Sequence, residues 1–344
     1  MTPVTLPKDR LGEWLSALKA RGPVVAPVAD EAGQVAFRRL EDGARPELGF
    51  VNSVEPPKAR FFPRSETLFA YSALGACPPS LEPSVPAGEP WVLFGIRPCD
   101  ARARLLLDAL FDDADGDPYY AARRDACTVV SLFCVEPGPD CFCESMGDVL
   151  SQPRGADVLV TPLSDALYVE PLTEKGATFL QSTDSLFGDA TEAHAAAKTE
   201  QVQATIARLR RHPDPAGIQE DVRKVYGDEG FWDRLTLGCI NCGVCTFLCP
   251  TCSCFDVMDD AIADAGHRFR CWDTCQFRAF AQEAAGHNPR PERWQRQRQR
   301  IAHKLWFSHA RFGEISCVGC GRCVQHCPVN VDMASIIEAV RNAS

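Results

Sequence analysis

CINCGVCTFLCP, residues 239–250, and CVGCGRCVQHCP, residues 317–328, are two copies of one cysteine pattern in this 344-residue chain. In each copy three cysteines follow one another at steps of three residues, and a fourth precedes a proline. Three thiolates at such steps can bind three corners of one 4Fe–4S cluster, while the fourth cysteine binds a neighbouring cluster. A single zinc prefers paired Cys-x2-Cys units, and scattered buried cysteines would not repeat the pattern. We therefore predict two 4Fe–4S clusters and, from them, electron transfer.

The exchange of fourth ligands divides these eight cysteines into two sets of four. The predicted ligands of cluster 1 are Cys239, Cys242, Cys245 and Cys327, and those of cluster 2 are Cys317, Cys320, Cys323 and Cys249.

The chain contains 18 cysteines, and its N-terminus carries no secretory signal. So many thiols without such a signal indicate reduced metal ligands in a cytoplasmic protein, not a disulfide framework. Residues 5–22 are instead predicted to form a capped amphipathic helix that ends at Gly22. Because no apolar run approaches the roughly 18–20 residues of a membrane span, we expect no direct membrane insertion.

The formal net charge of -10 argues against a general nucleic-acid-binding protein. One stretch is basic instead. It contains Arg290, Arg293, Arg296, Arg298, Arg300, Lys304 and Arg311. These residues are either the solvated face of a helix whose other side is apolar, or a basic rim that offsets cluster charge or docks an acidic partner.

The first 180 residues alternate strand-like and helical segments. The predicted strands are rich in Val, Leu and Phe and cover residues 24–28, 35–37, 91–96, 128–135, 157–163 and 167–172. A helix over residues 101–110 lies between two of them, so those two strands are expected to be parallel neighbours. We therefore predict an α/β-like domain with a mixed sheet over residues 1–180, followed by a helical connector over 181–230.

Residues 231–344 are predicted to form an all-helical ferredoxin domain, which makes the whole chain an α+β protein. The expected helices cover residues 257–265, 276–285 and 292–310, and a last helix begins after an N-cap at Asp332. Each cysteine run would lie at a turn between helices.

A third group of four cysteines is predicted to meet at one edge of the N-terminal sheet. Cys99 follows the strand 91–96, and Cys134 ends the strand over 128–133, so both would emerge at the carboxyl edge where ligand sites collect. Cys141 and Cys143 lie in the Gly/Pro-rich loop that follows and could fold back. These four soft ligands suit a third iron–sulfur cluster. A zinc site and unliganded thiols remain alternatives.

Cys252, Cys254, Cys271 and Cys275 form a further set near the first cysteine run. They could bind another metal centre, tune a cluster as neighbours of its ligands, or simply be buried. We assign no function to Cys77 and Cys127. The sequence has no dinucleotide or P-loop fingerprint, no paired histidine motif and no nucleophile with a recognisable base, so we predict no catalytic residue.

Several motifs resemble those of one family, the beta subunits of cytosolic sulfhydrogenase-type nickel–iron hydrogenases, to which an iron–sulfur component of anaerobic sulfite reductase also belongs. The motifs that carry the resemblance lie at residues 62–66, 95–100, 117–124, 141–143, 249–255, 272–275 and 288–291. The resemblance covers about residues 55 to 340. It implies an iron–sulfur electron-transfer subunit that works beside a flavin subunit handling NAD(P)H and a separate catalytic subunit, of hydrogenase or sulfite reductase type.

Two other functions remain open at this stage. The chain could be an enzyme in its own right that binds a sulfur substrate at an open iron of the N-terminal cluster. Four cysteine ligands there would leave no open position, whereas three would. It could also be a structural iron–sulfur protein, or a protein that binds nucleic acid through its arginine-rich helix. The net negative charge of the chain argues against both.

Overall fold

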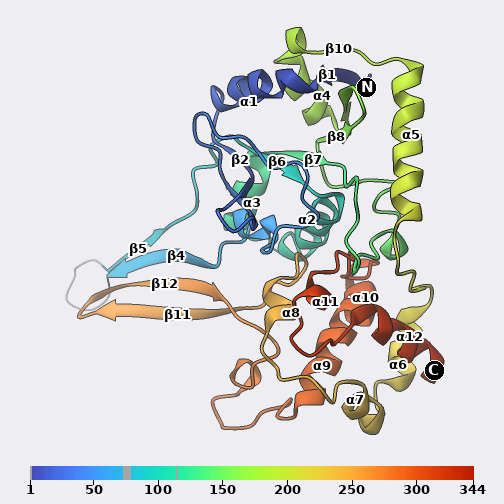
Figure 1. The fold of residues 1–344 in the computed structure, drawn as a ribbon. Helices are drawn as coiled ribbons and strands as arrows, with labels where there is room; N and C mark the ends of the chain where they lie inside the picture. The colour runs from blue at the N-terminus through green and yellow to red at the C-terminus, as the bar shows by residue number, and fades with distance from the viewer. Residues whose placement is uncertain (1, 73–78, 114) are drawn as a thin grey trace.

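The largest unit of the computed structural model is a mixed sheet of eight strands (Figure 1), and the structure describes residues 2–72, 79–113 and 115–344. In sheet order the strands are β10 (Gly188–Asp189), β1 (Val4–Pro7), β9 (Ala166–Pro171), β8 (Val158–Pro162), β7 (Cys127–Leu132), β6 (Trp91–Ile96), β2 (Val24–Ala29) and β3 (Val35–Arg39). Strands β2, β6, β7 and β8 are parallel, and antiparallel strands flank them on both sides. The predicted mixed sheet is confirmed.

Strands β6 and β7 are parallel neighbours, as the sequence predicts. Five of the six residues of β6 are buried, which fits a parallel strand covered on both faces. The chain passes from β6 to β7 through α2 (Pro98–Phe111) and α3 (Pro118–Ala126). The other helices of this part are α1 (Leu11–Lys19) and α4 (Glu174–Gln181). The predicted N-terminal helix is wrong at its start, because Val4–Pro7 pairs with β9 as strand β1.

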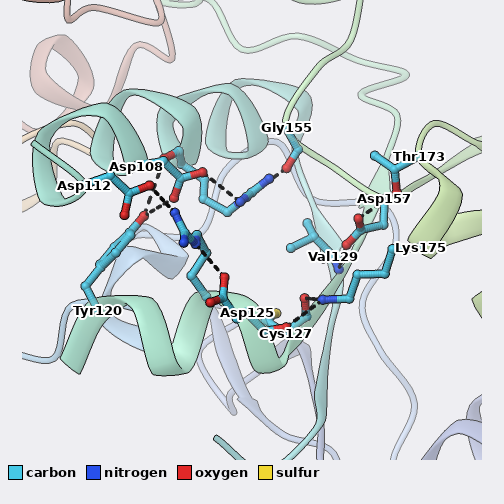
Figure 2. Close-up of polar contacts among 12 residues, drawn as sticks. Asp108, Asp112, Tyr120, Asp125, Cys127, Val129, Gly155, Asp157, Thr173 and Lys175 are labelled. Atoms are coloured by element: carbon cyan, nitrogen blue, oxygen red, sulfur yellow. Dashed lines mark hydrogen bonds and ion pairs between the residues drawn. The ribbon is translucent and has the colours of Figure 1, made fainter. Parts of the chain in front are cut away.

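Polar contacts join helix α3 to helix α2, and helix α4 to the sheet (Figure 2). The Tyr120 hydroxyl of α3 donates to Asp108 of α2 over 2.7 Å. The Lys175 ammonium of α4 donates to the Cys127 carbonyl over 2.6 Å. The Cys127 side chain itself is packed in the hydrophobic core, where burial raises the pKa of its thiol. The structure therefore gives Cys127 a packing role, and Cys77 lies outside the described residues.

Helices follow the sheet, as predicted for the connector. They are α5 (Glu192–Ala207), α6 (Ile218–Val225) and α7 (Glu229–Leu235). Helix α5 runs along one side of the molecule from the sheet toward the C-terminal helices (Figure 1). The connector begins with a short strand, β10, which the sequence did not suggest. The division at residues 180 and 230 stays a prediction.

The C-terminal part contains α8 (Val244–Phe247), α9 (Arg293–Ala302), a π-helix (His303–Phe307), α10 (Ser308–Phe312), α11 (Arg322–Gln325) and α12 (Met333–Ala343). Short 3-10 helices occur at Lys8–Arg10, Pro57–Arg60, Glu144–Met146, Asp184–Leu186 and Ala279–Ala281. A second core of buried side chains joins α6, α9 and α12 and includes Val222, Ile301, Leu305 and Ile337. Asp332 caps α12 by accepting a hydrogen bond from the Ala334 amide at 2.9 Å, as predicted.

The all-helical prediction is wrong for residues 255–272. This segment forms a hairpin of β11 (Phe255–Ile262) and β12 (Ala265–Trp272), which joins β4 (Ser65–Ser72) and β5 (Ser80–Pro83) in a second sheet of four strands. The sheet projects from the molecule as an arm (Figure 1). Val257, Met258 and Ile262 have helix-like spacing, but the pairing of β12 with the distant strand β4 decides the conformation. Residues 276–285 contain only the 3-10 turn Ala279–Ala281 in place of the predicted helix.

Arg270 anchors the arm to the main body. Its guanidinium is 4% exposed and pairs with Asp117 at the start of α3, in the main body, and with Glu66 of β4, within the arm, at 2.6 Å. The Trp272 indole donates to the Phe62 carbonyl over 3.2 Å. These contacts occupy several residues of the family motifs, which therefore have a structural role in holding the arm.

The second cysteine run lies directly against the loop that contains Cys141 and Cys143. The Phe142 amide donates to the Gly319 carbonyl over 2.8 Å. A Cβ atom at Gly319 would lie 2.6 Å from the backbone of Phe142, and φ at this glycine is +60°. A buried ion pair between Arg322 and Asp100, with N–O distances of 2.6 and 2.9 Å, reinforces this contact. Breaking such a pair on one side costs about 3–5 kcal/mol.

The close approach at Gly319 gives a first prediction. Gly319→Ala should destabilise the loaded chain by at least about 2 kcal/mol, because strain at positive φ and collision with Phe142 add. Gly33→Ala is a matched control, since φ is +75° there and nothing lies within 4 Å of the new Cβ. This control should lose only the stability that the positive φ of an alanine costs, about 1–2 kcal/mol. Denaturant unfolding of both variants measures the difference, and equal losses would contradict the packing argument.

Candidate iron–sulfur centres

The two cysteine runs have the same local structure. A glycine with positive φ, Gly243 at +79° and Gly321 at +78°, precedes a four-residue helix in each run, α8 and α11. The fourth cysteine follows each helix, and the amides of Cys249 and Cys327 donate to carbonyls of Thr246 and Val324. Helices α8 and α11 pack against each other. This packing brings the end of each run toward the other, as ligand exchange requires.

The four predicted ligands of cluster 1 line one cavity. Cys239, Cys242 and Cys245 come from the first run, and Cys327 comes from the end of the second. The Gln297 side chain of α9 donates to the Cys239 sulfur over 3.0 Å. Cys242 is exposed, so this cavity lies at the protein surface.

The four predicted ligands of cluster 2 line another cavity. Cys317, Cys320 and Cys323 come from the second run, and Cys249 comes from the end of the first. The Lys304 ammonium donates to the Cys249 sulfur over 3.1 Å and to the Ser316 carbonyl over 3.1 Å. Cys317 and Cys320 are buried, so this cavity lies deeper than the first.

The thiols around the second cavity differ in acidity. Burial raises the pKa of Cys317 to about 11 and the pKa of Cys320 and Cys323 to about 12. A hydrogen bond from the Cys252 thiol, helped by the Lys304 ammonium, instead lowers the pKa of Cys249 well below its ordinary value. Cluster ligands must be thiolates, so cluster binding has to release the protons of the buried thiols.

The residues around both cavities fit 4Fe–4S clusters. Four soft sulfur donors surround each cavity, and an amide or ammonium donor reaches one sulfur in each. Within residues 2–72, 79–113 and 115–344, no three His, Cys, Asp or Glu side chains lie close enough to hold a single metal ion. A cluster of four irons holds its thiolates farther apart than one ion does.

The structure also brings the third group of cysteines together. Cys99, Cys141 and Cys143 are buried in one packed cluster of side chains, with Cys134 partly buried against it. Cys99 lies in the first turn of α2, and Cys134 lies just after β7, as the parallel strands predict. The Cys143 thiol interacts electrostatically with those of Cys141 and Cys134, and the Cys99 thiol with that of Cys143. Burial raises the pKa of all four thiols.

Two buried arginines lie beside this third group. The Arg97 guanidinium donates to the Phe133 carbonyl over 3.0 Å and interacts with the thiols of Cys134 and Cys99. Arg322, fully buried, interacts with the thiols of Cys99 and Cys320. The third group and the second cavity therefore share a neighbour, and the Cys141 sulfur lies 3.7 Å from the Cys320 carbonyl.

Three members of the remaining set lie near one another, because the Lys58 ammonium interacts with the thiols of both Cys252 and Cys254, and Cys254 contacts Cys275. The thiols of Cys254 and Cys275 form a hydrogen bond, which lowers the pKa of Cys275 to about 6. The Cys252 thiol forms a hydrogen bond with the Cys249 sulfur. Cys271 lies on β12 opposite Asp256, with burial and Asp256 raising its pKa. The placement of Cys252 favours the hypothesis that it tunes a neighbouring ligand.

The structure corrects one reading of the basic stretch. Three of its residues, Arg296, Arg300 and Lys304, are buried, so the solvated-face interpretation is wrong for them. Arg300 and Lys304 line the cavities, together with Gln297, which the sequence analysis did not select. The spacing of Gln297, Arg300 and Lys304 at three and four residues places them on one helix face and could have indicated a shared role.

These cavities define the class of the protein: an iron–sulfur protein with a C-terminal two-cluster domain. Residues 238–331 match the family model described as 4Fe-4S dicluster domain, which spans both cysteine runs and implies two 4Fe–4S clusters.

The whole chain is similar to one characterised relative. It is 29% identical over 340 residues to the sulfhydrogenase 2 subunit beta of Pyrococcus furiosus, and the alignment covers 98% of each chain. The resemblance that the motifs indicate is confirmed along nearly the full length. The chain thus resembles a sulfhydrogenase subunit over nearly its full length and contains a 4Fe-4S dicluster domain.

The exchanged ligands give a second prediction. Cys249→Ser should remove a ligand of cluster 2, although Cys249 belongs to the first run, and should lower the iron content by up to about four atoms per chain. Cys271→Ser changes a cysteine that lines neither cavity and should leave the iron unchanged.

Iron and sulfide analysis of anaerobically purified protein measures both variants. The unchanged chain should hold at least about eight irons. A clean preparation with about four, or with mainly zinc, would contradict the assignment of two clusters.

Proposed function

We propose that this chain is the iron–sulfur electron-transfer subunit of a soluble multi-subunit oxidoreductase. It would relay electrons between a subunit that binds flavin and NAD(P)H and a catalytic subunit of hydrogenase or sulfite reductase type. The observation that carries the proposal is the contiguity of three four-thiol groups. Arg300 lines both the first and the second cavity, and Cys320 of the second interacts with Cys99 and Cys143 of the third.

The clusters would supply one-electron transfer when bound. Residues Cys99, Cys134, Cys141 and Cys143 would hold the third cluster, which lies outside the matched dicluster domain. Arg97 and Arg322 support this assignment, because a thiolate-bound cluster brings negative charge into a site where buried cations already lie.

The alternative enzyme function requires an open coordination position at the N-terminal cluster. Four thiols meet there, and a full set of four cysteine ligands leaves no iron free for a sulfur substrate. This arrangement favours electron transfer over substrate chemistry.

The surface around the first cavity supports a partner contact. Leu237 and Ile240 are 66% and 62% exposed, and Phe277 is 40% exposed. Ile240 lines the first cavity together with the exposed ligand Cys242, and the Phe277 ring lies next to Gly243. Exposed apolar groups beside a redox centre suit the docking of another subunit. A subunit bound there would bury the apolar area and would also lie close to the centre, so that the electron has a short path.

The relative is, by its name, a subunit of a sulfhydrogenase, which supports assembly with other subunits. In the part of the chain that the structure describes, no helix has the length and apolar character of a membrane span. The cytoplasmic location stays a prediction.

The third cluster gives a third prediction. The double variant Cys141→Ala with Cys143→Ala should lose up to about four irons per chain and keep the two C-terminal clusters. Cys127→Ala is the matched control, since Cys127 is equally buried but packs in the sheet core. Iron analysis and the electron paramagnetic resonance of the reduced protein measure the result. Unchanged iron in the double variant would exclude a third cluster at this place.

The division of labour gives a fourth prediction. Dithionite should reduce the isolated chain, which should show no NAD(P)H oxidation, hydrogen uptake or sulfite reduction by itself, because hydride chemistry belongs to cofactors of other subunits. Affinity purification from its own cells should recover a flavoprotein and a catalytic subunit. Ile240→Asp, which puts a charge on the exposed rim, should weaken one of these contacts. Turnover by the isolated chain would favour the enzyme function.

A further inference from the structure

Three side chains, one after another along a continuous helix, line the two cluster cavities in turn. Gln297 lines the first cavity only, Lys304 lines the second only, and Arg300 between them lines both. Gln297 and Arg300 belong to α9, and Lys304 belongs to the π-helix that continues it. Single π turns inside α-helices are frequent at functional sites, where they redirect side chains.

Gln297 and Lys304 already have sulfur partners, but Arg300 does not. Gln297 donates to Cys239 over 3.0 Å and Lys304 donates to Cys249 over 3.1 Å. Arg300 makes one long hydrogen bond, 3.4 Å to the Gln297 side chain. Its Nε and Nη2 atoms are buried and have no hydrogen-bond partner among the residues that the structure describes. A buried donor without an acceptor lowers the stability of the folded protein. We therefore expect these N–H groups to find an acceptor in the cavities that Arg300 lines.

The charges around Arg300 come from both ligand sets. Its guanidinium interacts with Cys245 of the first set and with Cys323 and Cys249 of the second. Burial alone would lower the pKa of Arg300. When these cysteines are thiolates, as cluster ligands must be, their charge outweighs burial and raises the pKa of Arg300 above its ordinary value. Arg300 is 2% exposed, so water screens these interactions little.

We propose that Arg300 is a shared cation that stabilises the reduced forms of both C-terminal clusters, and so raises the midpoint potentials of both. Reduction adds one negative charge to a cluster, and charge and hydrogen bonds to sulfur are known levers on the potential. Lys304 acts on the second cluster alone and Gln297 on the first alone. The inference rests on the proposed two-cluster assignment and extends it to the control of potentials.

The test is a redox titration of the full-length, cluster-loaded chain, followed by electron paramagnetic resonance and absorption. Arg300→Gln should make the potentials of both C-terminal clusters more negative. Lys304→Gln should lower one potential and leave the other unchanged. Arg298→Gln is the matched control. It removes the same charge from the same helix, but the Arg298 guanidinium lies 4.4 Å from the Tyr226 ring and lines neither cavity. It should shift neither potential.

The outcomes separate this inference from the proposed function. If the unchanged chain holds fewer than about eight irons, the two-cluster assignment fails. If it is loaded and Arg300→Gln shifts neither potential, or shifts only one, the shared role of Arg300 is wrong. An equal shift in Arg298→Gln would also overturn it, because the effect would then be one of net charge.

A second variant covers the case in which Arg300→Gln does not load. Arg300→Lys keeps the positive charge. The compact ammonium of lysine, unlike the wide guanidinium of arginine, cannot donate hydrogen bonds into both cavities at once. The variant should load both clusters and lower at least one potential. Unchanged potentials would overturn the proposal. The proposal would also be overturned if Arg300→Lys lost both clusters while Arg298→Gln bound them fully. Arg300 would then be needed for cluster assembly and not for setting the midpoint potentials.

Discussion

The requirement that buried negative charge be balanced governs the interior of this protein. Each thiolate-bound cluster would place net negative charge where little water reaches, and an unpaired charge in such a place is strongly unfavourable. The buried cations lie accordingly: Arg97 and Arg322 at the third group, Lys304 at the second cavity and Arg300 between the two cavities. Arg322 is also paired with Asp100, whereas two buried donor atoms of Arg300 have no partner among the described residues. Cluster binding and folding of the C-terminal part should therefore be tightly coupled.

The cysteine sites were the most predictable part of the molecule, because ligand spacing reflects the geometry of the cluster itself. Two repeated runs sufficed to divide eight cysteines into the sets that line the two cavities. The third group required a rule of topology in addition. Strands β6 and β7 are parallel neighbours, so Cys99 and Cys134 emerge at the same edge.

Two features could not be predicted, each for a physical reason. The β11–β12 hairpin owes its conformation to pairing of β12 with β4, far away in the chain, and a local window contains no sign of that partner. The basic stretch was ambiguous because its helix is amphipathic, with Ile301 and Leu305 in the core. Amphipathic patterns suggest that the polar face meets water. Here that face meets two cavities lined by cysteines, so Arg300 and Lys304 are buried as well.

The order of the sites constrains how partners can be arranged around this chain. The first cavity opens to the surface at Cys242, beside exposed Leu237 and Ile240, while the second is enclosed by Cys317, Cys320 and the loop of the third group. The second cavity adjoins both other groups, because Arg300 lines the first and second cavities and Cys320 interacts with Cys99 and Cys143. The third group lies at the carboxyl edge of the sheet, next to the second cavity, with Cys134 only partly buried. Two partner subunits would therefore contact different faces of the chain, one at the C-terminal helices and one near the sheet edge. The two partner contacts would then not compete for one surface.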